Sequence, residues 1–312
     1  MKHNVIAFGE VLWDLLPDKA IIGGAPFNFT YRIHSLGNNG YIISKVGKDD
    51  LGNLALENIQ RLGLTDKYVQ SDDTYPTGTV NIFFNKNMEP DFTIVRDVAY
   101  DFIDNSAELQ ELAARADCLC FGTLSQRNRK SRNTLCQLYE AFGGQHCFYD
   151  INLRKDCYTK EHIHESLALT EIVKLNNEEA LVLRDMFELT SSKLEHIALE
   201  LAEKFQIKIC LITMGEKGAL AISGKGEIVY VQGYKIELAD PLGSGDAFSA
   251  GFIHALLQNK SLEEACTLGN ILGAITATQR GATEPISQQQ IIQFTEQQLE
   301  RISEHSLEYY IT

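Results

Sequence analysis

The stretch DPLGSGDAFSAGF, from Asp240 to Phe252, contains two glycines and a serine immediately before a carboxylate. The small and apolar residues that follow predict a buried helix that begins there. The first amides of a helix have no partner within it, and they lie at the positive end of the helix dipole. Gly243, Ser244 and Gly245 are small enough for an anion to approach these amides. The stretch therefore predicts an anion site at the start of a helix.

Asp246 lies inside this positive environment, which is expected to keep its carboxylate ionised and ready to accept a proton from a nearby hydroxyl. Attack of a hydroxyl on a phosphoryl group needs an anion hole and such a base together. An aspartate at a helix start also serves as a simple cap, and this stretch alone leaves both interpretations open. A P-loop is excluded because no G-x-x-x-x-G-K-[ST] pattern occurs in the sequence.

The composition narrows the class of protein. The 312 residues, 44% of them hydrophobic, predict a single α/β domain over residues 1–312. A net charge of −14 disfavours binding to nucleic acid or to an anionic membrane surface. The seven cysteines include no C-x-x-C pair, which favours buried free thiols and a cytoplasmic protein. The absence of a secretory signal pattern and of an 18-residue apolar run supports the same expectation.

The dominant pattern is strand followed by helix. GYIISKVG (residues 40–47) predicts a buried strand, and the amphipathic DDLGNLALENIQRLG (49–63) predicts a helix that stops at Gly63. Comparable pairs recur as far as KICLITMG (208–215). Repeated units of this kind predict a doubly wound, mostly parallel sheet flanked by helices, with ligands bound beyond the carboxyl ends of its strands.

Two β-rich segments, at about residues 11–24 and 70–97, interrupt this alternation. We expect them to pair into a small separate sheet at one edge of the main domain. Such a sheet can act as a lid over a site, as an oligomer contact, or as both. A homodimer formed through the lid is therefore one expectation. Trp13, the only tryptophan, either lines a pocket beneath the lid or packs within it.

Four further stretches place polar and small residues where they can reach one crevice. They are FGEVLWDLLP with Asp14, IIGGAPFNF with Gly24 and Asn28, VKLNNEEA with Asn176 and Glu179, and LITMGEKGA with Thr213, Gly215 and Gly218. Together with DPLGSGDAFSAGF, they resemble the PfkB (ribokinase-like) family of carbohydrate kinases almost from end to end. GGAPFN resembles the first signature of the family, and DPLGSGDAFSAGF resembles the second.

The resemblance implies a ribokinase-like fold and ATP-dependent phosphorylation of a sugar hydroxyl. It makes Asp246 the general base, and it makes residues 243–245 the anion hole around the transferred phosphoryl group. It implies sugar contacts from the lid and from the start of the next helix, namely Asp14, Gly24 and Asn28. Any one of these motifs is weak evidence, whereas all of them in the family order are strong evidence.

The resemblance also implies a nucleotide site, which would be formed by Asn176, Thr213, Gly215, Gly218 and Asn270. Glu179 would take part in binding Mg²⁺ through water, consistent with the preference of Mg²⁺ for oxygen ligands and retained waters. Asp240 matches a residue near a monovalent cation, often K⁺. Pro241 departs from the usual Asp-Thr pair of the family and lacks an N–H, so the cation loop is expected to differ.

Ala25 and Pro26 stand where relatives that use ribose or sugar phosphates often have Lys-Gly, which disfavours a phosphorylated substrate. FGTLSQR and YDINLR resemble fructokinase segments, so Gln126 or Arg127 would approach the sugar, and Asn152 and Arg154 the phosphate region. Each could equally be an ordinary polar residue at a strand end.

Phosphorylation of fructose to fructose 6-phosphate is the first hypothesis. The next hypothesis is a kinase for 2-keto-3-deoxygluconate, ribose or a nucleoside. A further one is a non-catalytic protein of the same fold that binds a sugar or a nucleotide. A dehydrogenase is disfavoured because no G-x-G-x-x-G follows the first strand.

Overall fold

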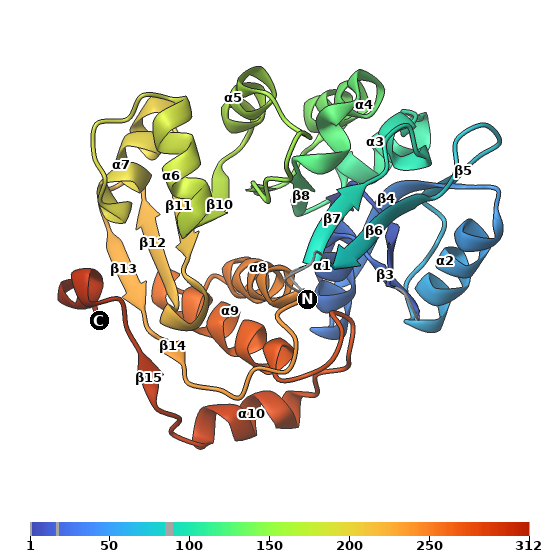
Figure 1. Cartoon of the computed structure of the whole chain (residues 1–312). Helices are drawn as coiled ribbons and strands as arrows, with labels where there is room; N and C mark the ends of the chain where they lie inside the picture. The colour runs from blue at the N-terminus through green and yellow to red at the C-terminus, as the bar shows by residue number, and fades with distance from the viewer. Residues whose placement is uncertain (1, 17–18, 85–89, 312) are drawn as a thin grey trace.

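A computed structural model describes residues 2–16, 19–84 and 90–311 of the chain. Its centre is a nine-stranded sheet (Figure 1). The strands follow the order β13 (Ile228–Val231), β12 (Ala219–Ser223), β11 (Ile209–Thr213), β10 (Ile172–Asn176), β9 (His146–Asp150), β8 (Cys118–Gly122), β1 (Asn4–Phe8), β4 (Asn39–Gly47) and β5 (Val69–Asp72). All neighbours pair in parallel except β11 with β12 and β12 with β13. The predicted mostly parallel sheet is confirmed, whereas the antiparallel edge was not foreseen.

Helices cover both faces of this sheet. One face carries α1 (Ala25–Ser35), α2 (Asp50–Arg61), α8 (Ser244–Leu257) and α9 (Leu262–Ala277). The other carries α3 (Ala107–Ala114), α4 (Arg129–Ala141), α5 (Lys160–Leu169), α6 (Asn177–Met186) and α7 (Leu194–Phe205). The side chains of β8 alternate accordingly, because Cys118 and Cys120 enter the first layer while Leu119 and Phe121 enter the second. Two buried layers therefore hold the sheet in place.

The remaining elements lie outside these layers. α10 (Gln288–Glu296) packs through Phe294 against Tyr234, and β14 (Gly233–Tyr234) pairs with β15 (Arg301–Ile302). The short 3₁₀ turns are η1 (Ala99–Phe102), η2 (Leu124–Arg127), η3 (Gly215–Lys217) and η4 (His305–Tyr310). None of the helices in the described part of the chain is long and apolar enough to cross a membrane.

A second, four-stranded sheet has the order β3 (Ala20–Gly23), β2 (Leu12–Leu15), β6 (Gly78–Phe84) and β7 (Pro90–Ile94). β2 pairs with β6 in parallel, which confirms that the two β-rich segments form one small sheet. The boundaries predicted for the lid, residues 70–97, were wrong at their start. β5 pairs with β4 at the edge of the main sheet, and only β6 and β7 reach the small sheet.

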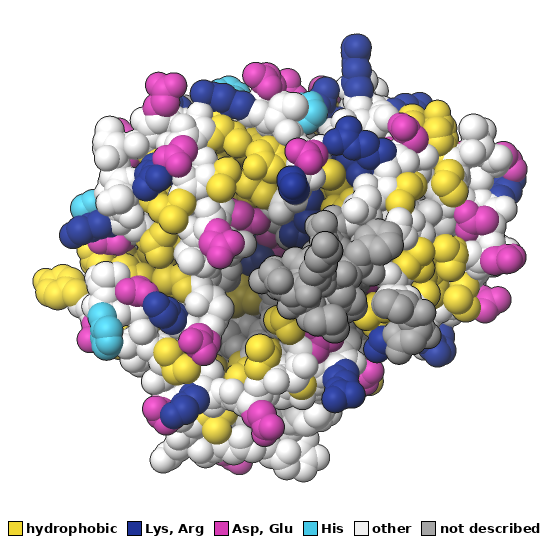
Figure 2. All heavy atoms as spheres, viewed as in Figure 1, with side chains coloured by type: hydrophobic (Ala, Val, Ile, Leu, Met, Phe, Trp, Pro, Cys, Tyr) yellow, Lys and Arg dark blue, Asp and Glu magenta, His cyan; other side chains and the backbone are white. Residues whose placement is uncertain are grey.

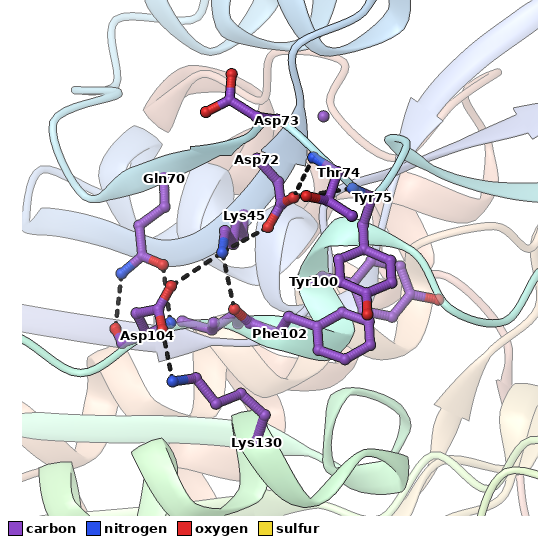
Figure 3. A network of polar contacts seen from close by, with 12 residues as sticks. Lys45, Gln70, Asp72, Asp73, Thr74, Tyr75, Tyr100, Phe102, Asp104 and Lys130 are labelled. Atoms are coloured by element: carbon purple, nitrogen blue, oxygen red, sulfur yellow. Dashed lines mark hydrogen bonds and ion pairs between the residues drawn. The ribbon is translucent and has the colours of Figure 1, made fainter.

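A buried ion pair explains why β5 stays with the main sheet (Figure 3). Lys45, on β4, places its Nζ 2.6 Å from Asp72 Oδ2 and 2.9 Å from Asp104 Oδ2. The other oxygen of Asp72 accepts hydrogen bonds from the amides of Thr74 and Tyr75, which turns the chain towards β6. Separating a buried ion pair is costly, so the end of β5 is held on β4. Alternation of polar and apolar residues could not reveal this long-range contact.

The strand order places the carboxyl ends of the parallel strands in one region. The chain extends from β1 to β4 and β5 on one side, and then returns to add β8, β9, β10 and β11 on the other. Such a reversal opens a crevice at the carboxyl ends of the strands. β1, β9 and β10 end there at Phe8, Asp150 and Asn176. The functional residues can therefore be sought at this end of the sheet.

Candidate active site

The predicted helix after the glycine-rich stretch is α8, and Gly243 is its N-cap residue. Gly243 has a φ of 76°, in the left-handed region that favours glycine. A side chain at this position would also meet Ala282, whose Cα lies 2.8 Å from the place of a Cβ. The tight approach of Ala282 therefore requires glycine here, independently of any ligand.

The amides at the start of α8 are partly open. The N–H of Ser244 donates to the carbonyl of Pro241, so this amide is already used in a turn. Among the described residues, the N–H groups of Gly245 and Asp246 have no such acceptor, and the buried Oγ of Ser244 has no partner. An anion would satisfy these donors. The anion hole at residues 243–245 stays a prediction, in which Ser244 would contribute its hydroxyl rather than its amide.

Asp246 lies in the first turn of α8, where Nδ2 of Asn28 donates a 2.8 Å hydrogen bond to its Oδ2. Burial raises the pKa of Asp246 to about 6, and the nearby Asp150 raises it as well, although the Asn28 hydrogen bond opposes both. The sequence analysis expected the positive helix start to keep this carboxylate ionised, but it did not foresee that burial and Asp150 raise its pKa. Asp246 is ionised near neutral pH, and its pKa suits a general base.

A buried polar cluster beneath α8 was missed in the sequence. Lys174, on β10, places its Nζ 3.0 and 2.8 Å from the two oxygens of Asp150, at the end of β9. Ser249 of α8 donates to the same carboxylate at 2.9 Å. Nζ of Lys174 also lies 3.4 Å from the Cβ position of Gly245, so a positive charge stands directly behind the open amides. In the sequence, Lys174 stands two residues before the N-x-x-E motif of VKLNNEEA, and this position was the signal that could have indicated a role near the site.

The predicted sugar contacts lie on β2 and at the start of α1. Gly24 is the N-cap residue of α1 with a φ of 114°, and a Cβ there would overlap the carbonyl of Glu10. Asp14 lies on β2, and Gly23 packs against its carboxylate. Burial raises the pKa of Asp14, while the charge of Arg154 lowers it. Arg154 also lowers the pKa of Asp246, so this exposed side chain belongs to the same electrostatic environment.

Glu10 is a further acid in this region that sequence reasoning did not select. Its side chain is 4% exposed, and Oε2 has no hydrogen-bond partner among the described residues. Burial raises its pKa to about 7, against the lowering effect of Arg154. The signal for it was present, because Glu10 directly follows the first strand in FGEVLWDLLP.

Three residues considered for the sugar site make contacts within the protein instead, namely Gln126, Arg127 and Trp13. The amide of Gln126 donates to the carbonyl of Gly122 and accepts from Ser166, so its polar groups are satisfied internally. Arg127 forms a two-point ion pair with Asp101. Trp13 is buried and donates to the carbonyl of Leu51, which favours packing over a pocket-lining role. A sugar contact by Gln126 stays a prediction, and these bonds argue against it.

The predicted nucleotide residues meet around the β12–β13 hairpin. Thr213 ends β11, and Gly215 and Gly218 bracket the η3 turn with φ values of 57° and 91°. A Cβ at Gly218 would overlap the carbonyl of Val231. Asn270, on α9, donates to the same carbonyl at 3.0 Å and to that of Gln232 at 3.2 Å. The structure brings Gly218 and Asn270 to one stretch of backbone, and their roles towards a nucleotide stay predictions.

Asn176 and Glu179 form a capping box at the start of α6. Each side chain accepts the backbone N–H of the other residue at 2.8 Å, and Oε1 of Glu179 accepts a third hydrogen bond from Leu153. No group of three or more acidic, histidine or cysteine side chains in the described part of the chain could hold a metal ion. Contact of Glu179 with Mg²⁺ through water stays a prediction, and both carboxylate oxygens of Glu179 already accept backbone hydrogen bonds.

Asp240 accepts the amide of Leu242 at 3.0 Å, and its own N–H donates to Ala277 at the end of α9. The loop before α8 is thus bonded to the last residue of α9. Figure 2 shows acidic and basic side chains that meet in a hollow on the face of the molecule that is turned to the viewer in Figure 1. A separate cavity of about 230 Å³ is lined by residues that include Arg96, Arg127 and His162, and it contains none of the residues predicted for catalysis.

The chain is similar to several known sugar kinases over most of its length. The fructokinase of Escherichia coli is 28% identical, with 90% of this chain and 95% of that protein covered. A sugar kinase of Pyrococcus horikoshii solved in complex with ATP has a TM-score of 0.79 at 26% identity, covering 94% and 98%. A fructokinase of Vibrio cholerae solved with fructose, ADP and calcium has a TM-score of 0.78 at 22% identity, covering 93% and 98%.

These structures confirm the ribokinase-like fold. The family model described as pfkB family carbohydrate kinase matches residues 18–289, which include three of the four strands of the small sheet (β3, β6 and β7), the start of α1 and all of α8. The chain therefore belongs to the pfkB family of carbohydrate kinases and is an ATP-binding sugar kinase.

Proposed function

We propose that this kinase phosphorylates fructose at its 6-hydroxyl. The observation that carries this proposal is the pairing of Asp246 with Asn28 beside the open amides of α8, in a chain whose relatives include named fructokinases. Ala25 and Pro26 at the start of α1 add no positive charge beside the predicted sugar contacts, which favours an uncharged sugar. Arg154 is the nearby cation, and it is balanced by Asp14 and Glu10.

In the proposed reaction, Asn28 and Asp14 orient the sugar, and the hydroxyl to be phosphorylated lies against Asp246. Asp246 accepts the hydroxyl proton as the oxygen attacks the γ-phosphorus, and ADP leaves from the opposite side. The amides of Gly245 and Asp246, with the hydroxyl of Ser244, stabilise the charge on the transferred group. Lys174 adds a fixed positive charge behind Gly245. The groups at the transferred phosphoryl therefore lie at the start of α8 or beside it, whereas the two sugar-orienting residues come from α1 and β2.

Mg²⁺ would be held by the ATP phosphates and by Glu179 through water, and it would neutralise charge on the phosphates. The roles of Thr213, Gly215, Gly218 and Asn270 at the nucleotide follow from the resemblance of TMGEKG to the nucleotide loop of the family. A monovalent cation at Asp240, a homodimer through the small sheet and a cytoplasmic location are part of the same proposal. The sedimentation coefficient of the protein and the K⁺ dependence of the rate test two of these points.

A coupled ADP-release assay tests the proposal with fructose, 2-keto-3-deoxygluconate, ribose, nucleosides and fructose phosphates, each with and without K⁺. We expect the highest kcat/KM with fructose, and ³¹P NMR of the product should show phosphate on the 6-hydroxyl. A higher kcat/KM with another sugar would reassign the substrate and leave the kinase chemistry intact. ADP release without any phosphorylated sugar would contradict the proposed mechanism.

A further inference from the structure

Arg32, in the interior of α1, is 1% exposed, yet it forms no ion pair with a carboxylate in the described part of the chain. Its Nη2 donates to the carbonyls of Ala282 and Glu284 at 3.3 and 3.1 Å. Nε and Nη1 are buried and have no partner among the described residues. Burial of a guanidinium without a counter-charge is costly, so a residue of this kind calls for an explanation.

The loop that Arg32 holds is part of the wall of the active site. Residues 278–287 connect α9 to α10, and Ala282 in this loop is packed against Gly243, the N-cap residue of α8. At the near end of the same loop, Ala277 accepts the amides of Ala239 and Asp240. The position of this loop therefore determines how closely Ala282 packs on Gly243 at the first turn of α8.

The helix that carries Arg32 also carries Asn28, one turn earlier. Residues four apart lie on the same face of a helix. From this face, Asn28 reaches the carboxylate of Asp246, and Arg32 reaches the loop that packs on Gly243. α1 thus supports both halves of the catalytic turn, the base and the anion hole.

We propose that Arg32 is a positioning residue for phosphoryl transfer, a built-in cation that holds the 278–287 loop against Gly243 and so fixes the open amides of α8. The cation acts through the backbone carbonyls of Ala282 and Glu284, and it has no contact with the substrate. This inference rests on the proposed function, because it assigns Arg32 a part in the same reaction.

Arg32→Met tests the proposal, since methionine fills much of the same space without donors or charge. A displacement of about 1 Å in a catalytic group can cost about 100-fold in rate. We expect kcat to fall by about 10- to 100-fold, while the KM for the sugar changes by a factor of about two or less. All assays contain the same excess of KCl, so that a cation site near Asp240 does not contribute to the difference.

Chemical rescue separates a cation effect from a loss of folding. Arg32→Ala leaves room for free guanidinium, which at non-denaturing concentration should recover kcat, while the same concentration of urea should not. Arg132→Met is the matched control, because Arg132 is also a helical arginine with an unpartnered nitrogen, but it lies on α4. The control should keep the rate of the unmodified enzyme, with and without guanidinium.

A double-mutant cycle locates the effect. Ala282→Gly removes the side chain that packs on Gly243, so its effect on kcat should not add to that of Arg32→Met if both act through the loop. Additive losses, or an Arg32→Met enzyme with unchanged kcat, would overturn the proposal. Hydrogen exchange gives a readout without activity: the hydrogen-bonded amides of Ser244 and Ala247 should exchange faster in Arg32→Met, and equal protection would contradict the positioning role. If the unmodified protein phosphorylates no sugar, the proposed function fails, and the exchange result still decides the role of Arg32.

Discussion

Asn28 and Asp246 are 218 residues apart in the chain, and their side chains are joined by a 2.8 Å hydrogen bond. The first belongs to the helix that follows the small sheet, and the second belongs to the helix whose first amides are open. This contact orients the carboxylate and stabilises its charged form, because a donated hydrogen bond favours the ionised acid. The proposed base is therefore set by two segments that only the fold brings together.

Asp246→Asn should remove turnover while leaving the fold and nucleotide binding in place. General-base catalysis contributes about 10²- to 10⁴-fold, so kcat is expected to fall within this range. The measurement is kcat with the preferred sugar, beside ATP affinity by calorimetry and the melting temperature. An Asp246→Asn enzyme with most of its kcat would refute the assignment of the base.

The rate should depend on the ionisation of Asp246. Because the base must be deprotonated, kcat/KM is expected to rise with pH through about 6 and to level off above pH 7. Asn28→Ala removes the hydrogen bond that lowers this pKa, so the acid limb should move to higher pH. Asn58→Ala, which removes a buried asparagine of α2, is the control and should leave the limb in place. A limb unmoved by Asn28→Ala would show that another group controls the profile.

Lys174→Met should destabilise the protein because it leaves Asp150 as an unpaired buried charge. Breaking a buried pair in this way costs about 3–5 kcal/mol. Urea unfolding should show most of that loss in the single variant. The double variant Asp150→Asn with Lys174→Met removes both charges, and it should be clearly more stable than Lys174→Met alone. Equal stabilities would mean that the ion pair does not hold β9 to β10.

Gly218→Ala should raise the KM for ATP and lower the melting temperature. Gly218 has a φ of 91°, and a Cβ would overlap Val231 in the strand that Asn270 contacts. Gly226→Ala is the matched control, since Gly226 also has a positive φ, 87°, but has no atom within 4 Å of the added Cβ. The control should lose only about 1 kcal/mol of stability and keep its KM for ATP. Equal effects of the two variants on this KM would argue against a nucleotide role for Gly218.

Glu10→Gln should stabilise the protein at high pH. Burial raises the pKa of Glu10 from 4.5 to about 7, so the folded state binds a proton that the unfolded state releases. The stability of the unmodified protein therefore falls as the pH rises from about 4.5 to 7, and it levels off above 7. At pH 8 the variant should be more stable by on the order of 3 kcal/mol, and the difference should become small near pH 4.5. Urea unfolding at both pH values measures this difference, and a gain that is independent of pH would exclude titration of Glu10 as its cause.

Local patterns in the sequence were sufficient to predict several parts of the molecule. The alternation of strands and helices, the start of α8 at the GSGD stretch and the glycine at the start of α1 all agree with the structure. These features depend on hydrophobic period, on φ and on unpaired amides, which are properties of a few adjacent residues. The pairing of the two β-rich segments was also correct, and it was inferred because both interrupt an otherwise alternating α/β chain.

Contacts between distant residues were decided by the tertiary structure. Lys45 holds β5 on the main sheet, Gln126 turns inward to Ser166, and Lys174 of β10 forms a buried ion pair with Asp150 of β9. A polar side chain can bond to any group that packing brings within about 3 Å, and its neighbours in sequence do not determine which. For this protein, the sequence by itself determined most of the helices and strands and the glycine-rich start of α8 that we propose to be catalytic. The tertiary structure decided which polar side chains meet that turn, because burial forces each of them to find a partner wherever the fold places one.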